Sequence, residues 1–121
     1  MNTSSPALRV DHSTPELASF IAGCQKITTD YQNANFPNAV RLLETRLGYS
    51  CGDRYVRVSR NEYTKENVLN ACSSHCFIDR TNGDVLKAAS WKTPAKGARG
   101  NIFDSSNGLG RMTPYGAGYN R

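Results

Sequence analysis

An Asn82-Gly83 pair between two apolar runs constrains the fold of this chain more than any other feature. Asn-Gly favours a type I′ turn, because both central residues of that turn take positive φ. The sequence therefore predicts a β-hairpin over residues 74–89. Along its first strand Cys76 and Ile78 alternate with Phe77, so we expect Phe77 on the face opposite the core.

A second strand is predicted over residues 54–60, where the side chains alternate with a period of two. One face carries two valines, and the other places Tyr55 beside Arg57. A guanidinium next to an aromatic ring is a pattern suited to an anionic ligand that has a planar ring. Residues 68–69 are expected to belong to a further strand.

The amino-terminal part of the chain has helical spacing. Ser13-Thr14-Pro15-Glu16 has the order of a helix start, with a hydroxyl cap, then Pro in the first turn, then an acid. A second helix is expected over residues 39–47, ended by Gly48, and a short one is considered from Pro94. The apolar residues of the first helix share one face: Leu17, Phe20, Ile21, Cys24 and Ile27.

Together these elements predict an α+β fold, with two N-terminal helices packed on a small antiparallel sheet. The length of 121 residues suits one domain over residues 1–121. Residues 1–12 are expected to form a loose arm, and residues 105–121 a Gly-rich tail. No apolar run is long enough to span a bilayer. The first residues lack the pattern of a secretory signal, so we expect the chain to stay in the cytoplasm with its thiols reduced.

The net charge is +5, and its position matters more than its size. Residues 1–79 carry as many acids as bases, whereas residues 80–121 carry seven bases and two acids. A local positive field favours an anionic partner such as a phosphate ester or nucleic acid. The alternative, that the bases simply keep a small protein soluble, is equally compatible with charge alone.

The four cysteines could form two disulfides or a metal site. The closest pair, Cys72 and Cys76, has three intervening residues, which is weak spacing for zinc, so no metal and no cofactor are expected. A Cys76–His75 nucleophile pair is disfavoured, because strand neighbours point to opposite faces. No catalytic motif is present in the sequence, and we expect a binding protein and not an enzyme.

The basic third also contains candidate ligand contacts. Arg99 lies between two small residues that offer it little packing, and nearby glycines let the backbone approach a ligand. Phe77, Trp91 and Phe103 are candidate stacking faces. For Trp91 and Phe103 the core is the more common place for a large apolar side chain.

At these residues the chain resembles the phage Thoeris anti-defence sponges, small proteins of tailed bacteriophages. The resemblance covers about residues 72–104 and short parts of the tail. It implies a small α+β fold, assembly into dimers or dimer-based higher oligomers, and sequestration of cyclic ADP-ribose isomers. Some members also bind cyclic oligonucleotides. The matching segments are His75–Asp79, Gly83–Ala89, Lys92-x-Pro94, Ala98–Phe103, Asn107-Gly108 and Pro114–Gly116.

The resemblance implies roles for individual residues. Phe77 corresponds to the stacking aromatic, and Arg99 to the arginine that grips phosphate. Asn101 and Arg111 are further contacts by the same resemblance. Strand parity adds Arg57, and Trp91 completes the candidate ligand-binding set.

The function expected from sequence is therefore that of a phage anti-defence protein. It would bind a cyclic nucleotide messenger in the cytoplasm of the infected bacterial host and block immune signalling without degrading the messenger. The alternative is an accessory protein that binds nucleic acid through its basic C-terminal third. Such binding would weaken steeply with salt.

Overall fold

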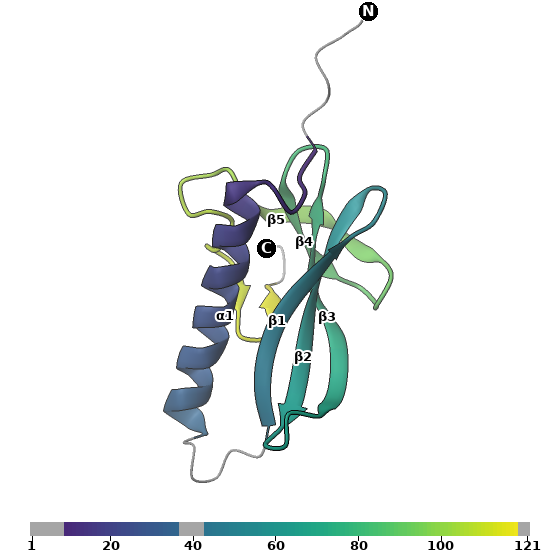
Figure 1. Ribbon diagram of the computed structural model, residues 1–121. Coiled ribbons are helices and arrows are strands. Elements are labelled where there is room, and N and C mark those ends of the chain that lie inside the picture. Colours follow the sequence, from purple (N-terminus) through teal and green to yellow (C-terminus); the bar gives the residue numbers. More distant parts are fainter. Residues whose placement is uncertain (1–8, 37–42, 119–121) are drawn as a thin grey trace, which may run out of the picture.

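One helix packs against one face of a five-stranded antiparallel sheet in the computed structural model, which describes residues 9–36 and 43–118 (Figure 1). The strands follow one another in the sheet in chain order, from β1 to β5. A short two-stranded sheet, β6 with β7, lies between the helix and the large sheet. The elements are α1 (Pro15–Asn35), β1 (Leu43–Cys51), β2 (Tyr55–Thr64), β3 (Leu69–Asp79), β4 (Asp84–Ala88), β5 (Pro94–Asn101), β6 (Met112–Thr113) and β7 (Gly116–Ala117).

The α+β class is confirmed, and the apolar stripe of α1 is the one expected. Leu17, Phe20 and Cys24 are buried against three valines and one isoleucine of the sheet. Each large apolar side chain buried in this way contributes roughly 1.5–3 kcal/mol. The sheet side of this core consists of Val56, Val58, Cys76, Ile78 and Val85.

The second helix, expected over residues 39–47, is wrong. Residues 43–51 form β1, and residues 39–42 lie outside the described part of the chain. Leu43 and Leu47 are four residues apart, a spacing that fits both a helix face and every second residue of a strand. Pairing along the whole of β1 with β2 decides the matter, because backbone pairing and side-chain packing override a weak local preference.

The short helix considered from Pro94 is also wrong, because this segment forms β5. Gly97 has a φ of 91°, which an α-helix does not accommodate, and Gly100 would weaken a helix further. As the last strand of the sheet, β5 has a free side where the missing N–H of Pro94 costs nothing.

The predicted hairpin is confirmed as β3 and β4, but its turn is not type I′. Gly83 has a φ of 85°, whereas Asn82 is not among the described residues with positive φ. The Gly83 N–H donates to the Asp79 carbonyl at 2.7 Å, which closes a longer loop over residues 80–83. The strand also begins earlier than expected, at Leu69, so residues 69 and 74–79 belong to one element.

The chain ends pack more closely than the sequence suggests. Residues 9–12 were expected in a loose arm, but Val10 is fully buried and exchanges backbone and side-chain hydrogen bonds with Arg80. Residues 1–8 lie outside the described part. In the Gly-rich tail Gly116 lies so close to the His75 carbonyl that a Cβ there would come within 2.3 Å of the oxygen. No described helix has the length and apolar character needed to cross a membrane.

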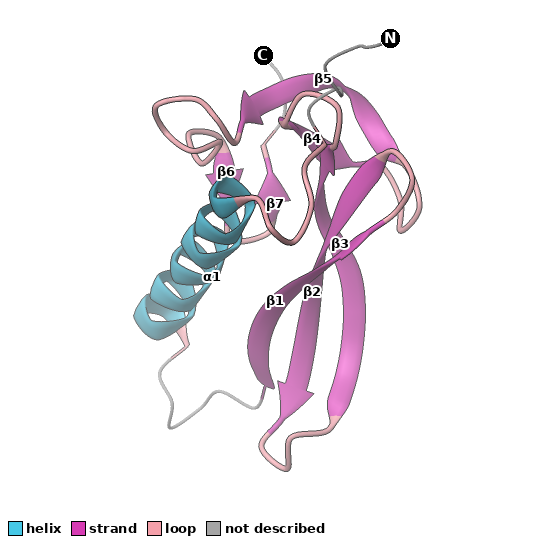
Figure 2. Ribbon diagram, turned by 45° about the horizontal axis from the view of Figure 1, so that its top comes forward, coloured by secondary structure: helices cyan, strands magenta, loops and turns pink. Residues whose placement is uncertain are grey.

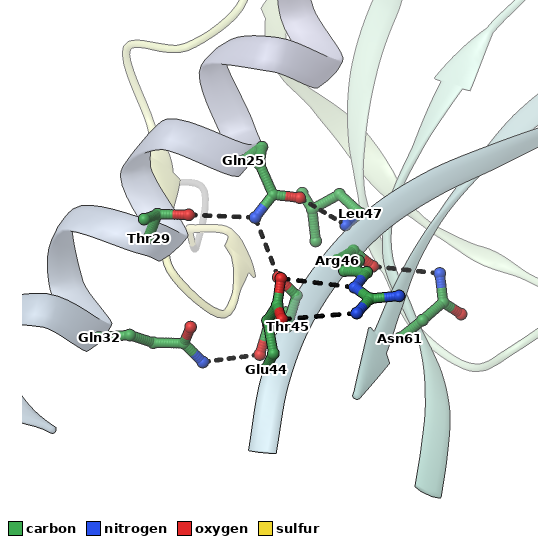
Figure 3. A network of polar contacts seen from close by, with 8 residues as sticks. All are labelled: Gln25, Thr29, Gln32, Glu44, Thr45, Arg46, Leu47 and Asn61. Atoms are coloured by element: carbon green, nitrogen blue, oxygen red, sulfur yellow. Dashed lines mark hydrogen bonds and ion pairs between the residues drawn. The ribbon is translucent and has the colours of Figure 1, made fainter. Parts of the chain in front are cut away.

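A side-chain amide on α1 holds the edge strand β1 in place (Figure 3). Gln25 donates to the Thr45 carbonyl at 3.0 Å and accepts from the Leu47 N–H at 2.8 Å. These are the backbone groups that another strand would pair with. Two turns later along α1, Gln32 donates to the Thr45 hydroxyl at 2.7 Å. The helix is therefore fixed to the sheet by polar contacts as well as by its apolar stripe.

Replacing Gln25 with Ala is expected to lower the free energy of unfolding by about 1–3 kcal/mol, because two edge-strand backbone groups lose their partner. Urea titration measures the change. Lys26→Ala is the matched control, since Lys26 is exposed and forms an ion pair with Asp30 one turn away. An equal loss in both variants would contradict this role for Gln25.

A bulge in β3 buries an unpaired histidine. Val58 pairs with Cys76 and Ser59 with Ser74, which leaves His75 as the extra residue, so regular strand alternation does not hold there. His75 is 2% exposed, and neither ring nitrogen has a hydrogen-bond partner among the described residues. Burial lowers the pKa of His75 to about 4, and the positive charge of Arg60 acts in the same direction.

Stability is expected to fall as the pH drops from 6.5 to 4. The folded state keeps His75 neutral, while the unfolded chain takes up the proton. His75 thus contributes stability that is complete above about pH 6.5 and lost on the way to pH 4, by about 3 kcal/mol. Thermal unfolding at stepped pH tests this with His75→Leu, which should flatten the pH dependence in that window. An unchanged profile would show that another group titrates.

Candidate cationic and aromatic cleft

The face of the sheet turned away from α1 carries a small cleft between the β1–β2 turn, the start of β2, Phe77 of β3 and the β4–β5 loop. Arg57 and Phe77 are cross-strand partners there. Phe77 is 2% exposed but lies outside the core cluster beneath α1, so its predicted place on the opposite face is confirmed. The Tyr55 ring meets the Phe77 ring edge-on, with centroids 6.1 Å apart. The cleft has a volume of about 260 Å³, and these rings line its floor.

Positive charge surrounds this aromatic floor. Arg54, Arg57 and Lys92 line the cleft, and Asp53 is the one acid among the described residues of its lining. The Arg57 terminal nitrogens and the Lys92 ammonium have no acceptor within hydrogen-bond distance among the described residues. A cleft with surplus cations and unoccupied donors is suited to an anion.

The β4–β5 loop brings Trp91 to the rim of the cleft. The Arg57 guanidinium lies over the Trp91 ring, with its central carbon 4.3 Å from the ring centroid. Its Nε donates to the Trp91 carbonyl at 2.8 Å. Trp91 is 43% exposed and Phe103 is 39% exposed, so the core placement that we considered more common for them is wrong.

Arg54 is held at the cleft by Asp79. Its guanidinium lies 3.4 Å from the Asp79 carboxylate and over the Tyr55 ring. Burial opposes ionisation of Asp79, but hydrogen bonds from Thr81 and Arg54 lower the pKa of its carboxyl below the ordinary value. The carboxylate therefore stays charged at neutral pH and orients Arg54.

Arg99 lies elsewhere and is occupied by the protein's own backbone. Its guanidinium donates to the carbonyls of Lys96 and Gly97 and, through Nε, to the Gly118 carbonyl at 3.1 Å. With 8% exposure, it fastens the C-terminal segment to β5. The small neighbours that suggested a free arginine leave room for these carbonyl contacts.

Asn101 and Arg111 are not part of the cleft either. The Asn101 amide donates to the Asn82 carbonyl and the Asp84 carboxylate, and its oxygen accepts from the Phe103 N–H. Those bonds tie β5 to the β3–β4 loop. Arg111 is exposed next to β6, at the opposite side of the sheet from Phe77. Of the predicted set, the structure brings together Phe77, Arg57 and Trp91.

Two cations of the cleft were missing from the predicted set. Lys92 was named only as part of the Lys92-x-Pro94 segment and received no role. Arg54 fell within the predicted strand over residues 54–60 without a site role, but it precedes the first residue of β2, where strand parity no longer applies. The position of Trp91, in the middle of the β4–β5 turn, depends on tertiary pairing, for which the sequence has no local signal.

A larger cavity of about 320 Å³ lies between α1 and β1, and the amide, carboxylate and guanidinium side chains that line it are already paired. Its amides hold the edge strand, and Arg46 contacts both Glu44 and the Tyr63 ring. The cationic cleft has more unoccupied donors and is therefore the better candidate site. No described group of three or more His, Cys, Asp or Glu is placed to hold a metal ion.

The chain belongs to a family of unknown function, DUF7717, whose model matches residues 16–116. The match includes α1, the whole five-stranded sheet and the cleft. No curated protein and no solved structure matches the chain.

Arg99→Gln is expected to destabilise the fold by about 2 kcal/mol, because backbone carbonyls lose a charged donor. The same change should speed amide hydrogen exchange in β5 and in residues 112–118, which Arg99 fastens. Lys96→Gln, three residues earlier in β5 and exposed, is the matched control and should leave both unchanged. An unchanged free energy of unfolding in Arg99→Gln would contradict this structural role and make Arg99 a candidate ligand contact again.

Proposed function

We propose that this protein binds and sequesters a small anionic ligand with an aromatic ring, a nucleotide, in the cationic and aromatic cleft. The observation that carries the proposal is the meeting of Arg54, Arg57 and Lys92 around Phe77 and Tyr55. Phosphate oxygens pair with the cations, and a base stacks on exposed aromatic surface at the rim. The volume is just under the roughly 300–1,000 Å³ of most ligand pockets, which suits one nucleotide unit.

The resemblance to phage sponges narrows the proposed ligand to a cyclic nucleotide messenger such as a cyclic ADP-ribose isomer. Sequestration in the infected bacterial host would then block immune signalling. The role of the phosphate-gripping arginine, which the resemblance to the sponges assigned to Arg99, is assigned here to Arg57, because Arg57 lines the cleft. Oligomerisation remains part of this proposal, since a partner subunit would enclose a ligand larger than one nucleotide unit.

The buried cysteines and histidine support a protein that binds its ligand without reacting with it. Burial raises the pKa of the Cys24 thiol to about 12 and that of the Cys76 thiol well above its ordinary value, so neither is a ready nucleophile. The His75 ring nitrogens form no hydrogen bond with Cys76 or any other described residue. These features support a ligand that is released intact.

The alternative function, nucleic-acid binding, is less well supported because Arg80 and Arg99, which belong to the basic residues of 80–121, are bound to the protein's own backbone. Arg80 donates to the carbonyls of Val10 and Gly52, and Arg99 to those of its own strand and tail. These guanidiniums are committed to the backbone and do not join a continuous strip of free cations. Of the other bases of this segment, Lys92 lines the cleft, where it joins Arg54 and Arg57 in a few focused contacts that suit a small anion better than a polymer.

Isothermal titration with cyclic ADP-ribose, cyclic dinucleotides and adenosine monophosphate tests the proposal. We expect saturable binding of at least one of them, weakened at least roughly tenfold in Arg57→Gln. Lys96→Gln removes the same charge outside the cleft and should bind like the unmodified protein. Mass spectrometry should recover the ligand unchanged.

Two surface thiols report where the ligand lies. Cys51 lines the cleft, whereas Cys72 is exposed farther along β3 with its Sγ 3.0 Å from the Asn61 side-chain oxygen. Bound nucleotide should slow alkylation of Cys51 and leave Cys72 unaffected. Absence of binding to every nucleotide, tight binding to long oligonucleotides alone, or a chemically altered ligand would contradict the proposal.

A further inference from the structure

The β4–β5 turn and one serine of β3 converge on a single carbonyl at the cleft. The Trp91 carbonyl accepts from the Arg57 Nε and from the Ser74 hydroxyl, both at 2.8 Å. Ser74 lies on β3, Arg57 on β2, and Trp91 in the loop after β4, so three segments of the chain meet at this oxygen.

The turn that presents this carbonyl is itself tightly bonded. The Ser90 hydroxyl accepts from the backbone N–H groups of Lys92 and Thr93. The Thr93 carbonyl accepts from the N–H groups of Ala89 and Ser90. A turn closed in this way fixes the direction of the Trp91 carbonyl and ring before any ligand arrives.

These contacts determine how Arg57 is presented. Its Nε is committed to the Trp91 carbonyl, and one face of its guanidinium is covered by the Trp91 ring. The two terminal nitrogens remain, and they form the end of a planar fork. Such a fork pairs end-on with two oxygens of one phosphate, an arrangement that a lysine cannot reproduce.

We propose that Ser74 and the turn over residues 89–93 form a positioning device that holds Arg57 end-on for two oxygens of a phosphate group. This inference rests on the proposed function and names the chemistry that the cleft recognises: a phosphate bound through both terminal nitrogens of Arg57, with the Lys92 ammonium beside it. Ser74 is a positioning residue, because it acts on Arg57 through the Trp91 carbonyl.

The device has a signature in the free protein. Nuclear magnetic resonance should show a distinct Arg57 Nε–H signal whose exchange with water is slow. Ser74→Ala should speed that exchange, and Ser74→Thr, which keeps the hydroxyl, should restore it. Ser73→Ala, a neighbouring exposed serine, is the matched control. Fast exchange in the unmodified protein, or equal exchange in all variants, would overturn the device whether or not a ligand binds.

The ligand chemistry is tested separately with inorganic pyrophosphate, adenosine monophosphate and a 5′-phosphorylated oligonucleotide. Ser74→Ala should weaken pyrophosphate binding roughly fivefold, the effect of losing one neutral hydrogen bond. Arg57→Lys keeps the charge but should weaken it roughly tenfold. Equal affinity in Arg57→Lys would overturn the end-on fork and indicate simple charge attraction. Stronger binding of the mononucleotide than of the oligonucleotide assigns the phosphate to a free nucleotide. Stronger binding of the oligonucleotide would overturn the proposed function. The positioning role of Ser74 would then still be decided by the exchange rate of the Arg57 Nε–H.

Discussion

The packing of a single amphipathic helix against one face of a five-stranded sheet is the contact on which the rest of the structure depends. Leu17, Phe20 and Cys24 supply the helix side of that core, and Gln25 fixes the edge strand beside it. Because one helix covers one face, the opposite face of β2 and β3 lacks a helical cover among the described residues (Figure 2). Phe77 is buried on that opposite face by Tyr55 and its other neighbours in place of a helix.

The cleft follows from this arrangement. The chain-order sheet places β2 beside β3, and the β4–β5 loop reaches past Ser74 of β3 to Arg57, although the loop is more than thirty residues from Arg57 in sequence. The same topology commits Arg99 and Arg80 to backbone carbonyls that secure the ends of the chain. The positive charge of the protein is thereby divided between structural guanidiniums and a few that face the cleft.

Much of this fold could be predicted from local patterns, and the failures have physical reasons. The α1 stripe, the β2 alternation and the β3–β4 hairpin depend on short-range periodicity, which the sequence shows directly. The β1 strand was missed because Leu43 and Leu47 fit two periods at once, and only pairing with β2 decides between them. In the site, parity placed Phe77 and Arg57 correctly. Arg99 was misjudged because its acceptors, such as the Gly118 carbonyl, come from elsewhere in the chain.

The most direct test of the account is to map which residues of the isotope-labelled protein respond when a cyclic nucleotide is added. Nuclear magnetic resonance follows every backbone amide, the Trp91 indole and the Arg57 Nε–H in one titration. The account predicts saturating shifts confined to residues 50–57, 77 and 91–92, with the amides around Gln25 and Thr45 unmoved. Shifts centred on the cavity between α1 and β1, or no shifts at saturating nucleotide, would contradict it.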